Sequence, residues 1–494
     1  MAEQDQQKKK ARLVWRIFKW IGLGLLALLL IAGIIFQAPW KVITLLVVIL
    51  AACTVLPKPV RKWFWLSAGV VVIALIIWVL LPEDNEDWRP YTFDEELAAM
   101  KAEYAIPDEE NAAVIYNELF ETLDVDSNQP KFFWRTTPSS LHEPWLTKDH
   151  PETAEWLKGH QSTIDKLIQA TKKEKCRFFP ICVEPVTYGN YLNRLPKIRN
   201  SERLLISFAN NDVAEDRNGD AIEKYSCVIQ IADHMFQQPA MMYYLVGFAI
   251  ENLSMQMLNR FVIESRPTAE QLQLISSFIK SLENNWGTDW RKMLDFEKLF
   301  AKNSLCCMVY EINPNGKIRR SRGLPPTAQE FKEKAPSETY RRRRCAKLGT
   351  IFVGLYYPSS PVKVIEIINT GFEKYFAMAE PDYDWSKEPD YVWRLSKFNY
   401  RAGVKFLAGI NEPTYYRVHE IYLTNLALRR GSRLLVAIKQ YNIEHGSWPS
   451  SLDKIKSGAP AEAFIDPVGG GQFEYENHGE RFSLFGETIN IWPK

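Results

Sequence analysis

The sequence predicts a mainly α-helical chain with N-terminal transmembrane helices, an irregular body of α-hairpins and a small C-terminal α+β module. Three observations predict this fold class. Apolar runs fill much of residues 1–82, apolar residues recur at i, i+3 and i+4 over residues 201–299, and apolar and polar residues alternate in two short segments near the C-terminus. With 494 residues, the chain is long enough for two or three domains with sizeable cores.

The first 82 residues are the predicted membrane anchor, with the chain in contact with the lipid bilayer through residues 18–81. Three apolar runs occur there: Phe18–Phe36, Val42–Leu56 and Trp63–Leu81. About 20 apolar residues are needed to cross about 30 Å of hydrocarbon, so the first and third runs are long enough. The second run has only 15 residues, and it crosses only if its flanks join it or the bilayer thins. No small-residue cleavage site follows the first run, which argues against a signal peptide.

The distribution of charge predicts the orientation of the anchor. Residues 1–82 carry 10 Lys and Arg against 2 Asp and Glu, whereas the remaining residues carry 51 and 57. Basic residues precede the first run and separate the second from the third, and acidic residues follow the third. The positive-inside rule then favours three crossings, with the N-terminus inside and the body outside. If Val42–Leu56 only re-enters the membrane, the body is cytoplasmic.

Residues 83–100 are interpreted as an acidic linker and residues 101–310 as a helical body. We expect a helix over Asp108–Leu123 that buries Ala112, Ile115, Leu119 and Leu123. A second helix carries a clear apolar stripe of Ile222, Tyr225, Ile229, Ala232 and Phe236.

Met241–Val262 is apolar on most sides but contains polar residues such as Glu251 and Asn259, which favours a buried core helix over a further membrane span. Thr268 and Gln271 have the spacing of a capping box.

Residues 311–347 form a basic loop region, and residues 348–410 are predicted to be helical with an acidic-aromatic loop. Residues 317–347 carry a net charge of +8, including Arg341, Arg342, Arg343 and Arg344. These arginines are candidates for an anionic partner, although a solvated loop is the favoured interpretation. In the acidic-aromatic loop, Asp382, Asp384 and Asp390 suit a sugar or a cation, but a packed surface loop is the favoured interpretation.

Residues 411–494 are predicted to contain a long helix and a small antiparallel sheet. The helix spans Thr414–His445, and Gly446 is placed to end it. Ser450 or Ser451 is expected to cap a short helix through Ile455, and Gln472–Glu476 and Arg481–Phe485 alternate as a hairpin.

Residues 432–486 resemble the globular head of the type II secretion major pseudopilin. The matching features are the Glu444–Leu452 turn, Asp466-Pro467 and the strand ending Phe482–Gly486. The resemblance implies a long helix packed on a small antiparallel sheet. Pilus assembly does not carry over, because the apolar runs lie far upstream and the acidic calcium-binding loop is missing. The whole layout resembles a group of bacterial membrane-anchored envelope proteins. This resemblance implies a multi-pass anchor in the inner (cytoplasmic) membrane of a bacterium, with the N-terminus cytoplasmic and the main body extracytoplasmic, and it implies no chemistry.

The residues that usually hold metals or cofactors form no recognised pattern, so neither is expected. Asp216, Asn218 and Asp220 alternate as in a calcium loop, but the glycine and the twelfth residue do not fit, which favours a polar turn with Asp220 capping a helix. The spacings of His142, His150 and His160 fit no zinc site. Cys176 and Cys182 are either a disulfide in an oxidising compartment or buried thiols. No Cys-x-x-Cys pair is present.

No catalytic motif was found, so the first hypothesis is a membrane-anchored, extracytoplasmic interaction or scaffold protein with a protein partner in the envelope. The slightly acidic body disfavours nucleic acid. The alternatives are an envelope hydrolase with an unrecognised site in the helical body, or an accessory component of a secretion or pilus-like system. A pocket that brings together Asp233, His234 or nearby carboxylates would favour the enzyme. Otherwise, His234 is expected to be a hydrogen-bonded interfacial histidine.

Overall fold

A computed structural model describes residues 89–125, 128–136, 139–178, 193–281, 285–320, 360–380, 383–385 and 412–492. These residues are mainly helical and contain two small antiparallel sheets, which confirms the mainly α fold class. None of the helices within these ranges combines the length and the apolar character needed to cross a membrane. The three apolar runs of residues 18–81 lie outside the described ranges.

The chain divides into two compact units, the first comprising Met1–Phe93, Phe300–Lys374 and Asp384–Ile410. Its described part contains an antiparallel sheet of β1 (Arg89–Pro90), β2 (Tyr310–Ile312) and β3 (Ile318–Arg320), together with most of α17 (Pro361–Ala377). The Asn303 side chain accepts a hydrogen bond from the Phe93 backbone at 3.1 Å, and so holds the strand β1 segment against the end of α14 (Trp286–Val309).

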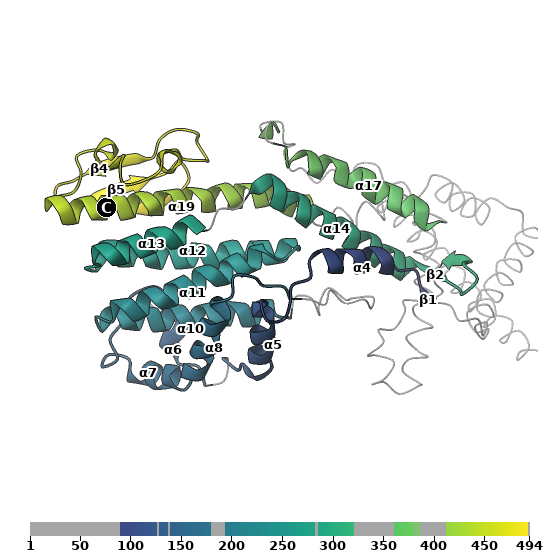
Figure 1. Cartoon of the computed structure of the whole chain (residues 1–494), viewed down its shortest axis with the longest axis horizontal. Helices are drawn as coiled ribbons and strands as arrows, with labels where there is room; N and C mark the ends of the chain where they lie inside the picture. Colours follow the sequence, from purple (N-terminus) through teal and green to yellow (C-terminus); the bar gives the residue numbers. More distant parts are fainter. Residues whose placement is uncertain are drawn as a thin grey trace, which may run out of the picture. The chain divides into compact units, whose positions relative to one another are not determined.

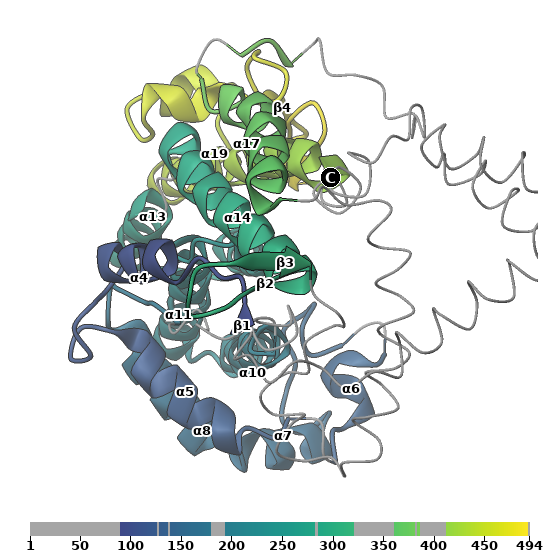
Figure 2. The same cartoon turned by 90° about the vertical axis from the view of Figure 1, so that its right-hand side faces the viewer.

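The second unit comprises Asp94–Leu299, Tyr375–Tyr383 and Asn411–Lys494. Its first helices are α4 (Asp94–Glu103), α5 (Ala112–Thr122), α6 (Lys131–Trp134), α7 (Pro151–Lys158) and α8 (Gln161–Thr171). Its central helices are α10 (Leu195–Ala214), α11 (Asn218–Phe236) and α12 (Met241–Glu264), followed by α13 (Ala269–Ser281), the start of α14, and α19 (Glu412–His445). Successive central helices pack side by side, and α19 lies along α12 and α13 (Figure 1). Helices α5 and α8 pack together as a pair (Figure 2).

The helical periodicity of the sequence is reproduced in the core of the second unit. The stripe of α11, from Ile222 to Phe236, is buried as expected. Helix α12 buries most of its length, and even Glu251 has no exposed surface. The capping box is also confirmed, because Gln271 accepts from the Thr268 backbone at 2.9 Å and Thr268 Oγ1 accepts from the Gln271 backbone at 3.2 Å.

Two sequence expectations in this unit were wrong. Helix α5 begins only at Ala112, after an Asn111 cap. Ala112 and Leu119 are buried as expected, but Tyr116 and Phe120 are buried in place of Ile115 and Leu123. The buried face of α5 differs from the expected one because the Tyr116 ring is buried, where its hydroxyl contacts His234. Asp220 does not cap α11: the helix begins at Asn218, so Asp220 already lies within its first turn.

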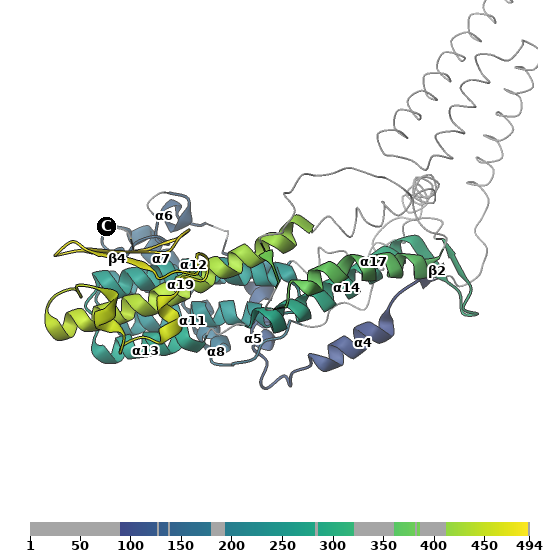
Figure 3. The same ribbon diagram turned by 90° about the horizontal axis from the view of Figure 1, so that it is seen from above.

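The C-terminal part of the second unit joins a long helix to a three-stranded antiparallel sheet. Helix α19 ends at His445, and Gly446 has a φ of +68°, as expected for the residue that ends it. Strands β4 (Glu474–Asn477) and β5 (Phe482–Phe485) form the expected hairpin, and β6 (Asn490–Trp492) adds a strand that the sequence did not predict. The sheet lies beside α19 (Figure 3). The short 3-10 helix η2 (Leu452–Ile455) is present, but the Ser451 side chain makes no capping hydrogen bond to it.

Candidate functional site

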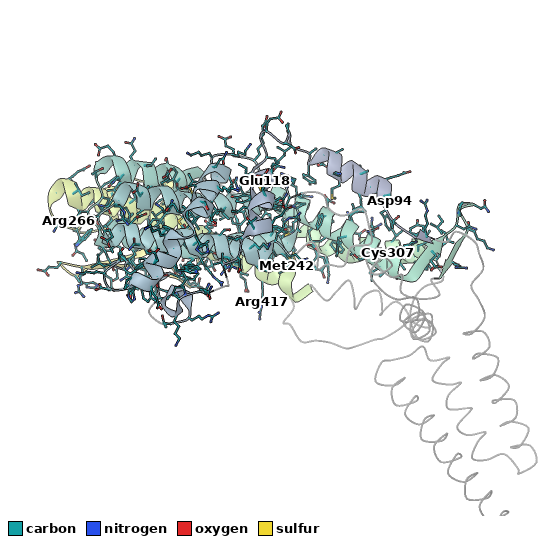
Figure 4. All side chains as sticks on the ribbon, turned by 90° about the horizontal axis from the view of Figure 1, so that it is seen from below. Asp94, Glu118, Met242, Arg266, Cys307 and Arg417 are labelled. Atoms are coloured by element: carbon teal, nitrogen blue, oxygen red, sulfur yellow. The ribbon has the colours of Figure 1, made fainter. Side chains whose placement is uncertain are left out.

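A cavity of about 320 Å³ lies within the second unit, where the end of α11, the start of α12 and the start of α14 come together. The cavity is at the N-terminal end of α12, near Met242, which is labelled in Figure 4. Arg266, also labelled there, follows the C-terminal end of the same helix. Its walls carry two acids, two bases, aromatic rings and amides, namely Tyr104, Arg177, Asp233, Phe236, Gln237, Gln238, Pro239, Tyr244, Asn285, Thr288, Asp289 and Lys292.

Two adjacent glutamines fix one wall of the cavity. Gln237 accepts from the Cys176 backbone at 2.8 Å and donates to the Glu174 carbonyl at 2.8 Å. Gln238 accepts from the Phe178 backbone at 3.1 Å and donates to the Cys176 carbonyl at 2.9 Å. The two amides therefore tie the backbone of residues 174–178 to the end of α11, and each amide oxygen accepts one backbone hydrogen bond.

Asp233 provides the first carboxylate of the cavity from the last turn of α11. Its Oδ2 accepts from Gln237 at 2.8 Å and from Gln230 at 3.3 Å. Burial raises the pKa of Asp233, and the hydrogen bond from Gln237 and the charge of Arg429 offset part of that rise.

Asp289 provides the second carboxylate from the first turn of α14. The helix begins there because the Asn285 side chain accepts from the Thr288 backbone at 3.0 Å and so caps it. Burial raises the pKa of Asp289, while a hydrogen bond from the Tyr244 hydroxyl lowers it and the charge of Asp233 adds to the rise. The two carboxylates thus sense each other electrostatically.

A buried ion pair lies next to Phe236, one of the residues that line the cavity. Arg429 of α19 binds Glu251 of α12 through two nitrogens, with Nη2 at 2.7 Å from Oε2 and Nε on Oε1. The guanidinium also lies 5.6 Å from the centre of the Phe236 ring, which lines the cavity. The charge of Arg429 also acts on Asp233 and lowers the pKa of that carboxyl, and the charge of Glu251 opposes this effect in part.

His234 does not take part in the cavity. It is fully buried, its Nε2 lies 2.8 Å from the Lys173 carbonyl, and its Nδ1 lies 3.0 Å from the Tyr116 hydroxyl. The carbonyl can only accept, so Nε2 carries the proton and Nδ1 accepts from Tyr116. Burial lowers the pKa of His234 to about 4, which keeps the ring neutral. The expectation of a hydrogen-bonded interfacial histidine is confirmed.

The remaining sequence candidates fall partly outside the described residues. Arg341, Arg342, Arg343 and Arg344 lie outside them, as do Cys182, Asp382 and Asp390. Cys176 is a buried free thiol. Within the described ranges, no three His, Cys, Asp or Glu side chains are grouped to hold a metal ion.

Sequence reasoning singled out Asp233 but missed Asp289, Tyr244 and the two glutamines. Asp289 lies 56 positions after Asp233, and only the packing of α11, α12 and α14 brings the two together. The Gln237-Gln238 pair directly precedes Pro239 and was the one local signal, because two amides at the end of a buried helix need partners.

Comparisons of the chain with protein-family models, with curated proteins and with solved structures gave no match. The function must therefore be argued from the fold and the cavity.

Proposed function

We propose that this chain is a membrane-anchored binding protein of the bacterial envelope, whose second unit lies outside the cytoplasmic membrane and holds a small polar ligand in its cavity. The cavity carries this proposal. Its volume of about 320 Å³ is in the range of small-molecule sites, and most of the side chains that line it are polar or charged, beside three aromatic rings.

The side chains of the cavity favour binding over covalent catalysis. The described residues that line it include no serine, cysteine or histidine, so they form no Ser–His or Cys–His pair. His234, which follows Asp233 in the sequence, does not line the cavity, because its two ring nitrogens contact the Tyr116 hydroxyl and the Lys173 carbonyl. Of the polar groups that line the cavity, Asp233 and Asp289 lie on helices, and the side chains of Gln237 and Gln238 are fixed by backbone hydrogen bonds. This suits a preorganised binding site.

An envelope hydrolase is the second candidate, because two carboxylates share the cavity. Burial raises the pKa of both Asp233 and Asp289, as a general acid requires. Hydrolysis of an envelope glycan or peptide that is lost in both Asp233→Asn and Asp289→Asn would establish this candidate in place of the first.

The proposed anchor rests on the apolar runs of residues 18–81, and the pseudopilin-like interpretation of residues 432–486 is part of the same proposal. The three-stranded sheet that follows α19 supports that interpretation. We place no pilus-like assembly role on the module, because the anchor and the module are separated by the whole helical body.

A reporter fusion tests the placement of the body. We expect a dual alkaline phosphatase and fluorescent reporter, joined after Tyr91, to show phosphatase activity, because three crossings place this point outside the cytoplasm. Fluorescence without phosphatase activity would mean that Val42–Leu56 does not cross, and the proposed compartment would be wrong. A fusion after Pro57, which follows the second run, is the matched control and should report the cytoplasm.

A further inference from the structure

We propose that one face of the first unit rests on the phospholipid head groups of the membrane that holds the anchor. This juxtamembrane face combines one end of the sheet β1-β2-β3 with the first turn of α17. Its exposed side chains are those of Arg89, Lys317, Ile318, Val362 and Lys363. The inference rests on the proposed function, because it requires the anchor of residues 18–81, but it makes no use of the cavity.

The register of the sheet gathers the first three of these residues at one end. Ile312 pairs with Arg89 on one side and with Ile318 on the other, so the three side chains form a row across one face of the sheet. The hairpin turn that ends at Lys317 lies between Ile312 and Ile318, at the same end. Arg89 is exposed and Ile318 is 41% exposed, so the row presents an apolar side chain and a cation to the outside.

The first turn of α17 lies on the same side of the sheet as this row. The Tyr310 hydroxyl donates to the Ser360 carbonyl at 3.4 Å. Tyr310 lies two positions before Ile312, so the two side chains share one face of β2, and α17 begins against that face. Val362 is 66% exposed, the largest fraction among the exposed large apolar side chains of the described ranges. The juxtamembrane face therefore has two exposed apolar side chains.

Cations flank the two apolar side chains. Arg89, Lys317 and Lys363 are exposed, and no ion pair involves any of them in the part of the chain that the structure describes. The exposed acid nearest to Val362 in α17 is Glu366, one turn further along, so positive charge is in excess. Apolar side chains among cations are typical of surfaces that lie in the membrane interface, where the apolar groups enter the head-group layer and the cations contact phosphates.

The covalent chain keeps this face close to the anchor. Only seven residues, 82–88, separate Leu81 at the end of the third apolar run from Arg89 at the start of β1. Even a fully extended chain spans at most about 3.6 Å per residue, which limits the distance between Leu81 and Arg89 to about 29 Å. Four of these seven residues are acidic and are repelled by phosphates, so the contact falls to the cationic face of the sheet and α17.

Spin labels measure how deep the juxtamembrane face lies in a bilayer. The full chain with Ile318→Cys or Val362→Cys would carry a nitroxide in vesicles of phosphatidylethanolamine and phosphatidylglycerol. Oxygen concentrates in lipid and a nickel chelate in water, so the ratio of their collision rates with the label reports depth. We expect this ratio to be at least about threefold higher at both positions than at Leu274→Cys, because only the juxtamembrane face enters the head-group layer.

The comparison needs two controls. Leu274 is the matched position, because it is 45% exposed on α13 of the second unit. The unaltered chain, treated with the same label, gives the background from its own cysteines. Thermal melting followed by circular dichroism checks that each variant is folded.

Charge reversal tests the part played by the cations. Lys317→Glu combined with Lys363→Glu should bring both labels to the value of Leu274→Cys, because each lysine near an anionic surface favours contact about fivefold. Lys158→Glu combined with Lys166→Glu, at exposed sites of α7 and α8, is the matched control and should leave the ratio unchanged. If the first double variant does not fold, high salt tests the same contact without substitution, because it screens the charges.

The outcomes separate this inference from the proposed function. If the chain does not float with the vesicles in a density gradient, the anchor fails and the inference fails with it. If the chain floats but the labels at positions 318 and 362 report water as Leu274→Cys does, the anchor stands and the inference is overturned. Depth that survives both charge reversal and high salt would overturn the contact between the cations and phosphates.

Discussion

Individual buried charges shape the second unit more than its surface ion pairs do. Glu251 and Arg429 lie 178 positions apart in the chain, and their side chains are 0% and 4% exposed. Each would be costly to bury alone, so the pair specifies how α12 and α19 pack. The surface pair Arg260–Glu264 is open to water and contributes little to stability.

Breaking the buried pair should be far more harmful than replacing it. We expect Arg429→Met to lower the free energy of unfolding by about 3 to 5 kcal/mol, because Glu251 is left charged and buried. The double variant Arg429→Met with Glu251→Met should recover most of that loss. Urea denaturation followed by circular dichroism measures both. A double variant that is as unstable as the sum of its two single variants would show that the pair is not coupled.

Glu297 shows how a buried acid makes stability depend on pH. It is 3% exposed, and its Oε1 accepts from the Met241 backbone at 3.0 Å, which caps the start of α12. Burial raises the pKa of Glu297 to about 7. Because the folded pKa is the higher one, Glu297 stabilises the fold below its ordinary pKa and loses that contribution as the pH rises through about 7.

Glu297→Gln should therefore stabilise the protein at pH 8 and have little effect at pH 4.5. Glutamine keeps the oxygen that accepts from Met241 but carries no charge, so we expect a gain of about 1 to 3 kcal/mol at the higher pH. The control Glu264→Gln, at an exposed site, should change stability by less than about 0.5 kcal/mol. Melting curves at the two pH values decide it: an equal effect at both would contradict a raised pKa.

At the scale of elements, close backbone approaches hold the C-terminal sheet against α19. A Cβ added at Gly431 would lie 2.5 Å from Ile491 Cγ1, so only glycine lets strand β6 come this near to the helix. Strand β6 therefore packs on α19 through a contact between Gly431 and Ile491, which are 60 positions apart.

Gly431→Ala should destabilise the second unit by about 1 to 3 kcal/mol, because the new methyl group overpacks against Ile491. Adding Ile491→Ala should restore part of that loss by making room. Gly219→Ala is the matched control: it lies in α11 with nothing within 4 Å of the added Cβ, and should be neutral or stabilising by up to about 1 kcal/mol. Denaturant unfolding compares the three, and equal effects of the two glycine variants would refute the packing argument.

The elements that were predictable from the sequence are those set by local periodicity and capping. The stripe from Ile222 to Phe236, the Thr268–Gln271 box and Gly446 each act through neighbours within a few residues. The face of α5 was not predictable, because Tyr116 is buried to meet His234, 118 positions away. The cavity was missed for the same reason: its carboxylates are joined by tertiary packing alone.

For the whole molecule, we propose a membrane anchor joined to a helical binding body. The anchor is an expectation from residues 18–81, and the cavity belongs to the described second unit. The joint claim is that the cavity opens on the outer side of the cytoplasmic membrane. Lys292 is well placed to report on this, because it lines the cavity and is exposed.

The most direct measurement is the labelling of Lys292→Cys by a membrane-impermeant maleimide in intact bacterial cells. The unaltered chain is the control for background, and the cysteines of its described residues, Cys176, Cys227, Cys306 and Cys307, are buried. We predict labelling of the variant above that background without permeabilisation. Labelling that appears only after the cells are permeabilised would place the cavity in the cytoplasm and contradict the account.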